Sequence, residues 1–228
     1  WIDRIELEKE DGKVTHVVCN DIATLVYIAN QACITPHVWL SKVDNLRCPD
    51  RLIFDLDPPQ GNFELVRLAA IALRKAAEEA EMESFVMTTG SEGLHIVIPL
   101  SGEEEFDTVR DFAREIAEGV ARRDPDKFTL EQRKDKREGR LFLDTLRNSY
   151  AQTSVTPYAL RARKGAPVAT PLSWDELHDK SLRADRYTIS NIFKRLGQKK
   201  DPWEKLSKKN HRVEDARPKL RAKLESEK

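Results

Sequence analysis

The segment RLIFDLDPP at residues 51–59 constrains the fold more than any other stretch of this 228-residue chain. Its apolar run predicts a β-strand, which the two prolines end because proline has no N–H to donate to a sheet. Side chains two positions apart on a strand share a face, so Asp55 and Asp57 project together while Leu56 points into the core. Adjacent ionised carboxylates repel unless a cation lies between them, and oxygen ligands suit magnesium or manganese. The segment therefore predicts a metal site at a strand end.

A second apolar run, LFLDTLR at residues 141–147, delivers another acid, Asp144. Three carboxylates on neighbouring strand ends would hold two divalent ions, Mn²⁺ or Mg²⁺, as in enzymes of phosphoryl transfer. A purely structural explanation also fits these residues. In that case Asp144 caps a helix, and Asp55 and Asp57 begin a turn.

Composition excludes several classes of protein. Lys plus Arg equals Asp plus Glu at 39 each, but residues 191–228 carry 13 basic against 6 acidic residues. Such a stretch either binds phosphates or is an ordinary solvated, partly helical tail. The three cysteines lack CxxC spacing, which argues against a disulfide framework or a zinc site. No apolar run approaches the roughly 18 residues of a membrane helix, so we expect a soluble, intracellular protein.

The hydrophobic periodicity mixes strands and helices without strict alternation. It predicts helices at 63–82 and 106–120, strands at 52–57, 85–88 and 95–100, and an extended piece at 35–40. This order favours an α+β fold, with mixed or antiparallel sheets covered by helices. We expect one domain at residues 1–205 and a basic C-terminal tail at 206–228.

The turn TGSEGLH at residues 89–95 has the composition of a phosphate-binding loop. Glycines let backbone N–H groups approach phosphate oxygens, and Thr89, Ser91 and His95 offer side-chain donors. Further candidates are His37 and three arginines whose planar guanidinium groups suit phosphate, Arg137, Arg147 and Arg161. Each feature by itself is equally compatible with an ordinary turn, a buried histidine or surface charge.

Taken in order, these motifs resemble the polymerase/primase domain of bacterial ligase D, in the archaeo-eukaryotic primase superfamily, over roughly residues 1–205. The resemblance implies a primase-like fold around a central cleft and two divalent ions, often manganese. It also implies template-dependent addition of NTPs or dNTPs, preferably ribonucleotides, at broken or gapped DNA ends. Such a nucleotidyltransferase would serve non-homologous end joining beside Ku and a DNA ligase, in the prokaryotic cytoplasm at the nucleoid.

Carried over by position, the resemblance makes Asp55, Asp57 and Asp144 the catalytic, metal-binding acids. The nucleotide-binding residues it implies are His37, Thr89, Ser91, His95, Arg137, Arg147 and Arg161. Two departures stand out. Glu92 occupies a turn position that is commonly Lys or Arg, and family members usually carry residues before the position of Trp1, including part of the surface for the DNA 5′-phosphate.

Parts of the sequence also fit two other functions. A haloacid-dehalogenase-like phosphatase also uses a DxD motif, but it expects Thr or Val where this chain has Pro59. A catalytically weakened DNA- or nucleotide-binding module of primase type is the stronger alternative. Glu92 motivates it, because an anion facing a triphosphate should weaken binding.

Overall fold

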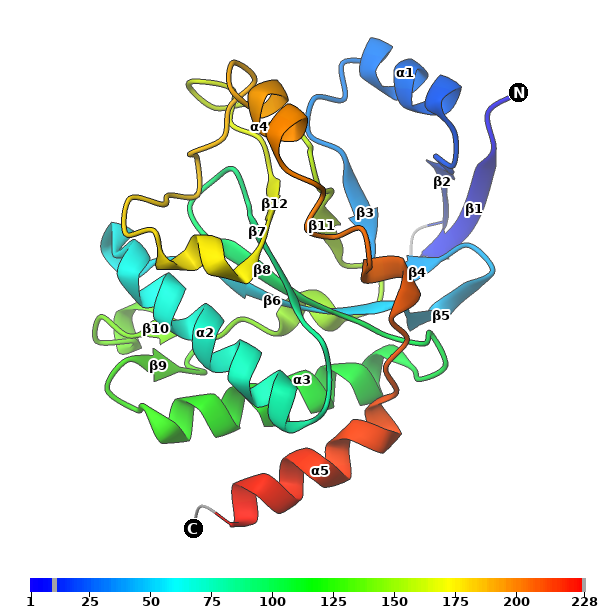
Figure 1. Ribbon diagram of the computed structural model, residues 1–228. Coiled ribbons are helices and arrows are strands. Elements are labelled where there is room, and N and C mark those ends of the chain that lie inside the picture. The colour runs from blue at the N-terminus through cyan, green and yellow to red at the C-terminus, as the bar shows by residue number, and fades with distance from the viewer. Residues whose placement is uncertain (10–11, 227–228) are drawn as a thin grey trace.

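A four-stranded antiparallel sheet organises the computed structural model, which describes residues 1–9 and 12–226 (Figure 1). Its strands follow the order β12, β7, β8, β6, so the acid-bearing strand β6 lies at one edge. Their bounds are β6 Arg51–Leu56, β7 Phe85–Thr88, β8 Leu94–Pro99 and β12 Thr170–Leu172.

Two amphipathic helices, α2 (Phe63–Glu79) and α3 (Phe106–Arg123), cover one face of this sheet (Figure 1). The even-numbered residues of β6, namely Leu52, Phe54 and Leu56, are fully buried in the core formed with these helices. The alternation of strand side chains therefore directs the odd-numbered residues, Asp55 among them, to the opposite face.

The opposite face is covered by a small antiparallel pair, β3 (His37–Trp39) and β11 (Thr153–Val155). Ile53 belongs to a small apolar cluster with Leu40 on this side of the sheet. Strand β3 ends at Trp39, directly before Leu40 of this cluster. His37 therefore lies on the same side of the sheet as the acids.

The remaining elements surround this centre. A hairpin and the helix α1, whose N-cap Asp21 accepts a 2.7 Å hydrogen bond from the Thr24 N–H, form the N-terminal portion. The bounds are β1 Arg4–Lys9, β2 Gly12–Val17, α1 Ile22–Asn30, β4 Ser41–Lys42, β5 Asn45–Pro49, β9 Phe128–Thr129, β10 Leu141–Phe142, α4 Ile192–Gln198 and α5 Val213–Glu225. Short 3₁₀ turns occur at Pro59–Gly61, Lys134–Lys136, Leu146–Asn148, Trp174–His178 and Leu206–Lys208. Within the described residues, no helix combines the length and apolarity needed to cross a membrane.

The predicted α+β fold class is confirmed. Strand β6 ends at Leu56, so Asp57 lies one residue past the strand rather than within it. Helix α2 ends at Glu79 instead of residue 82, because Glu81 adopts a left-handed backbone with φ of 58°. The boundary at residue 205 stays a prediction, although α5 beyond it buries Val213, Ala216 and Leu220 against the core.

Candidate active site

Asp55 is the most constrained acid of the site. It pairs with His95 across β6 and β8, while its N–H donates to the Asp144 carbonyl at 3.1 Å. Asp55 and His95 therefore form a non-hydrogen-bonded pair, in which side chains lie close. His95 Nε2 lies 3.3 Å from Asp55 Oδ1, and Arg147 Nε donates to Oδ2 at 3.1 Å. Burial opposes ionisation, but His95 and Arg147 outweigh it and lower the pKa of Asp55 to about 2.

Asn148 fastens the segment that carries Asp144 to the open edge of β6. Its amide accepts a 2.8 Å hydrogen bond from the Ile53 N–H and donates to the Ile53 carbonyl at 2.7 Å. The same amide nitrogen donates to Thr145 O at 2.9 Å, and the residue is fully buried. An edge strand has unpaired backbone groups, and here a side chain and the Asp144 backbone satisfy them.

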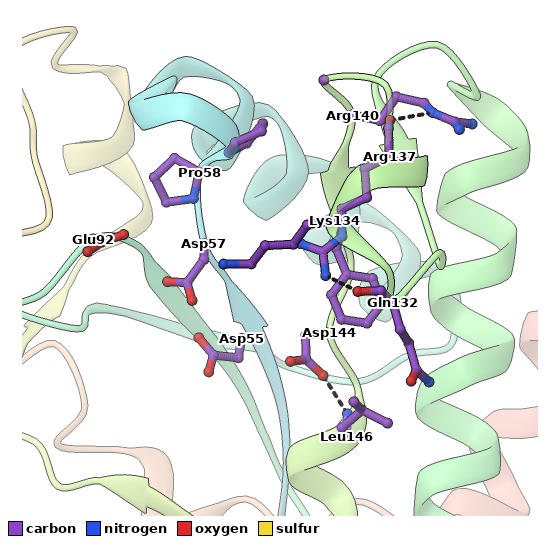
Figure 2. A pocket seen from close by; sticks show the side chains of 13 residues that line it. Asp55, Asp57, Pro58, Glu92, Gln132, Lys134, Arg137, Arg140, Asp144 and Leu146 are labelled. Atoms are coloured by element: carbon purple, nitrogen blue, oxygen red, sulfur yellow. Dashed lines mark hydrogen bonds between the residues drawn. The ribbon is translucent and has the colours of Figure 1, made fainter.

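Asp57 and Asp144 face the same space as Asp55 (Figure 2). Desolvation raises the pKa of Asp57, and the negative charges of Asp55 and Glu92 add to that shift. Burial and the charge of Asp55 also raise the pKa of Asp144, although the Leu146 N–H, 2.7 Å from its Oδ1, works in the other direction. Two acids beside a firmly ionised third thus resist ionisation unless positive charge is added.

Two adjoining cavities meet at Asp55 and Asp57, which line both. The larger, of about 650 Å³, has an acidic wall and a basic wall from which Lys134 extends into the space (Figure 2). Its lining residues are Asp55, Asp57, Pro58, Pro59, Glu92, Gln132, Lys134, Arg137, Gly139, Arg140, Phe142, Asp144 and Leu146. The smaller, of about 110 Å³, is lined by His37, Asp55, Asp57, Thr89, Ser91, His95, Arg147, Thr153, Ser154, Val155 and Arg161.

The turn between β7 and β8 is tied together by the Thr89 hydroxyl. This oxygen accepts from the N–H groups of Ser91 at 3.2 Å and Gly93 at 3.3 Å, and lies 3.1 Å from the Gly93 carbonyl, to which it donates. Gly93 packs so tightly that a Cβ would lie 1.7 Å from the Leu56 carbonyl oxygen. The turn therefore fixes its own shape and its position against the end of β6.

The ten site residues predicted from sequence all line these two cavities. Desolvation, with the charges of Arg161 and Arg147, lowers the pKa of His37 despite its hydrogen bond to Thr35 O. Arg137 donates to the carbonyls of Glu131 and Gln132 at 2.9 and 2.7 Å, which uses part of its guanidinium to shape its own loop. The roles of all ten residues stay predictions.

Among residues 1–9 and 12–226, no group of three or more His, Cys, Asp or Glu side chains that could hold a metal ion is found. Asp55 Oδ1 lies beside His95 and its Oδ2 accepts a hydrogen bond from Arg147, so a metal bound by Asp55 would share these oxygens with both partners.

Sequence reasoning missed two contributors, Asn148 and Lys134. Asn148 follows Asp144 by four residues, and a buried amide at that spacing gives no sequence signal distinct from a loop asparagine. Lys134 lies three residues before Arg137 in a highly charged segment, where one lysine among several charged residues gives no distinct signal.

Comparisons with known proteins identify the family of this chain. The sequence matches the family described as LigD, primase-polymerase domain, over residues 1–203. It is 32% identical over 191 residues to the multifunctional non-homologous end joining protein LigD of Mycolicibacterium smegmatis, covering 82% of this chain and 25% of that protein. The corresponding protein of Pseudomonas aeruginosa is 32% identical over 195 residues, covering 84% of this chain and 23% of that protein. The bifunctional LigD of Bacillus subtilis is 31% identical over 195 residues, covering 85% and 32%.

The chain thus spans about a quarter to a third of the length of these curated relatives. The structure resembles the polymerase domain from Mycobacterium tuberculosis ligase D, solved in complex with DNA, with a TM-score of 0.84 and 28% sequence identity. That match covers 92% of this chain and 76% of the other. The chain therefore belongs to the LigD primase-polymerase domain family, whose members are DNA-directed nucleotidyltransferases.

Proposed function

We propose that this domain is a divalent-metal-dependent nucleotidyltransferase that adds nucleotides, preferentially ribonucleotides, to the 3′ ends of broken or gapped DNA. The observation that carries the proposal is the group of three carboxylates that line one cavity, in which burial and then the charge of Asp55 raise the pKa of both Asp57 and Asp144. Added positive charge would relieve this repulsion, and a pair of divalent ions is the simplest source of it.

The donor set suits Mn²⁺ or Mg²⁺, because both prefer carboxylate oxygen ligands. Asp55, Asp57 and Asp144 would hold the ions, with Asp55 exchanging at least one of its contacts to His95 or Arg147. When bound, the ions would polarise the reacting phosphate and the primer hydroxyl. The protein itself holds Asp144 beside Asp55 by two means: the hydrogen bonds between the Asn148 side chain and the Ile53 backbone, and the hydrogen bond from the Asp55 N–H to the Asp144 carbonyl.

The positive side chains favour a nucleoside triphosphate as the substrate. His37, Arg147 and Arg161 line the small cavity together with Asp55, Asp57 and Ser91. Guanidinium groups bind phosphate oxygens through paired hydrogen bonds, so this cavity would take the phosphates of the incoming nucleotide. Arg137, together with Lys134, lies on the other cavity wall, where it can neutralise a polyanionic substrate.

DNA as the second substrate is supported by the related ligase D polymerase domain, which was solved in complex with DNA. The names of the LigD relatives support a role in non-homologous end joining. We infer that Ku and a DNA ligase act beside this domain, in the same chain or as separate proteins.

Primer extension on gapped DNA tests the proposal. With Mn²⁺ and ribonucleoside triphosphates the domain should extend the primer, and Asp55→Asn should abolish extension while the circular dichroism spectrum is retained. A matched control is Asp107→Asn, a carboxylate whose side chain is 80% exposed on α3, outside both cavities.

Absence of extension by the unaltered domain, across Mn²⁺ and Mg²⁺ and across ribo- and deoxyribonucleotides, would reject the proposal. If DNA and nucleotide still bound, the result would favour the binding module without turnover. Extension that persisted in Asp55→Asn would assign the activity to a contaminating polymerase.

A further inference from the structure

Glu92, which lines the larger cavity, forms an ion pair with Arg163. Arg163 Nη2 donates to Glu92 Oε1 at 3.1 Å, across 71 residues of sequence. Arg163 lies two residues after Arg161 in a tight turn, in which its N–H donates to the Arg161 carbonyl at 2.8 Å and its own carbonyl accepts from Ala166. Glu92 lines the larger cavity and Arg161 the smaller, so Arg163 is tied to a lining residue of one cavity and follows a lining residue of the other by two positions.

Arg161 is electrostatically coupled both to Arg163 and to the acids. After burial, the charge of Arg163 is the largest influence that lowers the pKa of Arg161, while Asp55 and Asp57 raise it. The Arg161 stem lies against the β7–β8 turn, since a Cβ at Gly90 would be 2.8 Å from its Cγ. Both guanidinium groups are therefore held beside the same turn and face the same charged region.

The ion pair adds little to the stability of the domain. The side chains of Arg163 and Glu92 are 48% and 59% exposed, and exposed pairs contribute little because water and salt screen them. An unpaired Glu92 would nevertheless add a fourth negative charge around a cavity that already holds Asp55, Asp57 and Asp144. Its pairing with Arg163 thus matters for the binding of an anion rather than for folding.

We propose that Arg163 is a further substrate-binding residue, which contacts the outer phosphates of the bound nucleoside triphosphate, and that Glu92 is its positioning residue. The inference rests on the proposed nucleotidyltransferase function and deepens it. Glu92 lacks the positive charge for a phosphate contact, but it holds a guanidinium within 3.1 Å of itself at the cavity mouth. A contact at the outer phosphates predicts that triphosphates, and not monophosphates, depend on Arg163.

The test measures equilibrium binding of ATP and of AMP to the full chain with Mn²⁺, alongside the KM for ATP and kcat in primer extension. Arg163→Ala should weaken ATP binding and raise its KM about 10-fold, the size expected for one charge-assisted hydrogen bond, and leave kcat and AMP binding nearly unchanged. Lys164→Ala is the matched control, because Lys164 is an exposed cation next in the chain, whereas Arg163 is the cation that pairs with Glu92. It should change none of these quantities.

Two double variants separate a phosphate contact from simple neutralisation of Glu92. Glu92→Gln in the Arg163→Ala background removes both charges, and ATP binding should stay weak because no cation reaches the phosphates. Glu92→Lys in that background supplies a cation from the turn instead, and binding should recover to within about 3-fold of the unaltered chain.

Each outcome decides the inference. Unchanged ATP binding in Arg163→Ala, or full recovery in the Gln double variant, would overturn it. An equal loss for AMP would also overturn it. If the unaltered domain binds ATP but extends no primer, the proposed function fails, and the binding measurements still decide the role of Arg163. A domain that binds no ATP at all would refute both.

Discussion

Asn148→Ala offers the sharpest test of how the site is built. The side chain makes three hydrogen bonds from a fully buried position, two of them to the backbone of Ile53 and one to Thr145 O. Alanine would leave the Ile53 N–H and C=O without a partner, and each unsatisfied buried group costs about 1–3 kcal/mol. We therefore expect unfolding to require about 3 kcal/mol less free energy, a large part of the roughly 5–15 kcal/mol that stabilises a domain.

Urea denaturation measures this loss. With a slope of about 2–3 kcal/mol/M, the midpoint should fall by roughly 1 M. The control is Asn45→Ala, whose exposed amide donates one 2.8 Å hydrogen bond to Gly102 O. Its midpoint should move by no more than about 0.2 M, since an exposed group finds water as a new partner. Equal shifts in the two variants would refute the conclusion that Asn148 fastens the Asp144 segment to β6.

Three further predictions concern the acids and the turn. Gly93→Ala would place a Cβ 1.7 Å from the Leu56 carbonyl oxygen, so the end of β6 must move. The Tm measured in thermal unfolding should drop by about 5–10 °C. An unchanged Tm would contradict the tight packing of Gly93 against β6. Mn²⁺ affinity, measured by electron paramagnetic resonance, should rise with pH above 3.8, because Asp57 and Asp144, whose pKa values are raised, must lose a proton to bind the ion. Asp57→Asn should make this rise smaller. An affinity that does not change with pH in the unaltered domain would argue against these two ligands. The pKa of Asp55 is lowered from 3.8 to about 2, so the stability that its ionised form contributes is complete above pH 3.8 and is lost as the pH falls toward 2. Asp55→Asn should therefore make the free energy of unfolding depend less on pH in this range. An identical pH dependence in the variant and the unaltered domain would contradict this.

The sequence predicted the place of Asp55 on its strand well because period-2 alternation is a local property. Leu52, Phe54 and Leu56 are buried on the helix side as the pattern required, and Asp55 lies on the other face. The long helices were equally accessible, because their apolar spacing extends over several turns. Local patterns therefore determined both the acid strand and the layer that covers it.

Long-range partners were beyond such reasoning. Asn148 reaches Ile53 across 95 residues and Arg163 reaches Glu92 across 71, and neither pairing has a local signature. The Thr89 hydroxyl stays a predicted nucleotide donor, and in the structure it also holds the turn closed through Gly93. Tertiary hydrogen bonds decide which polar groups are free for a ligand, and spacing alone does not reveal them.

The three acids of the site differ in how readily they ionise. Asp55 keeps its charge at any ordinary pH, because His95 and Arg147 more than compensate for its burial. Burial is the main reason why the pKa values of Asp57 and Asp144 are raised, and the fixed charge of Asp55 adds to that shift. An incoming divalent ion would gain most from the two reluctant carboxylates, since its charge offsets the repulsion from Asp55. Asp55 Oδ2 would be shared between a bound ion and Arg147, which would leave the guanidinium more available to the small cavity that it lines, where the proposal places the phosphates. Metal binding and triphosphate binding should therefore be positively coupled through the single ion pair between Asp55 and Arg147.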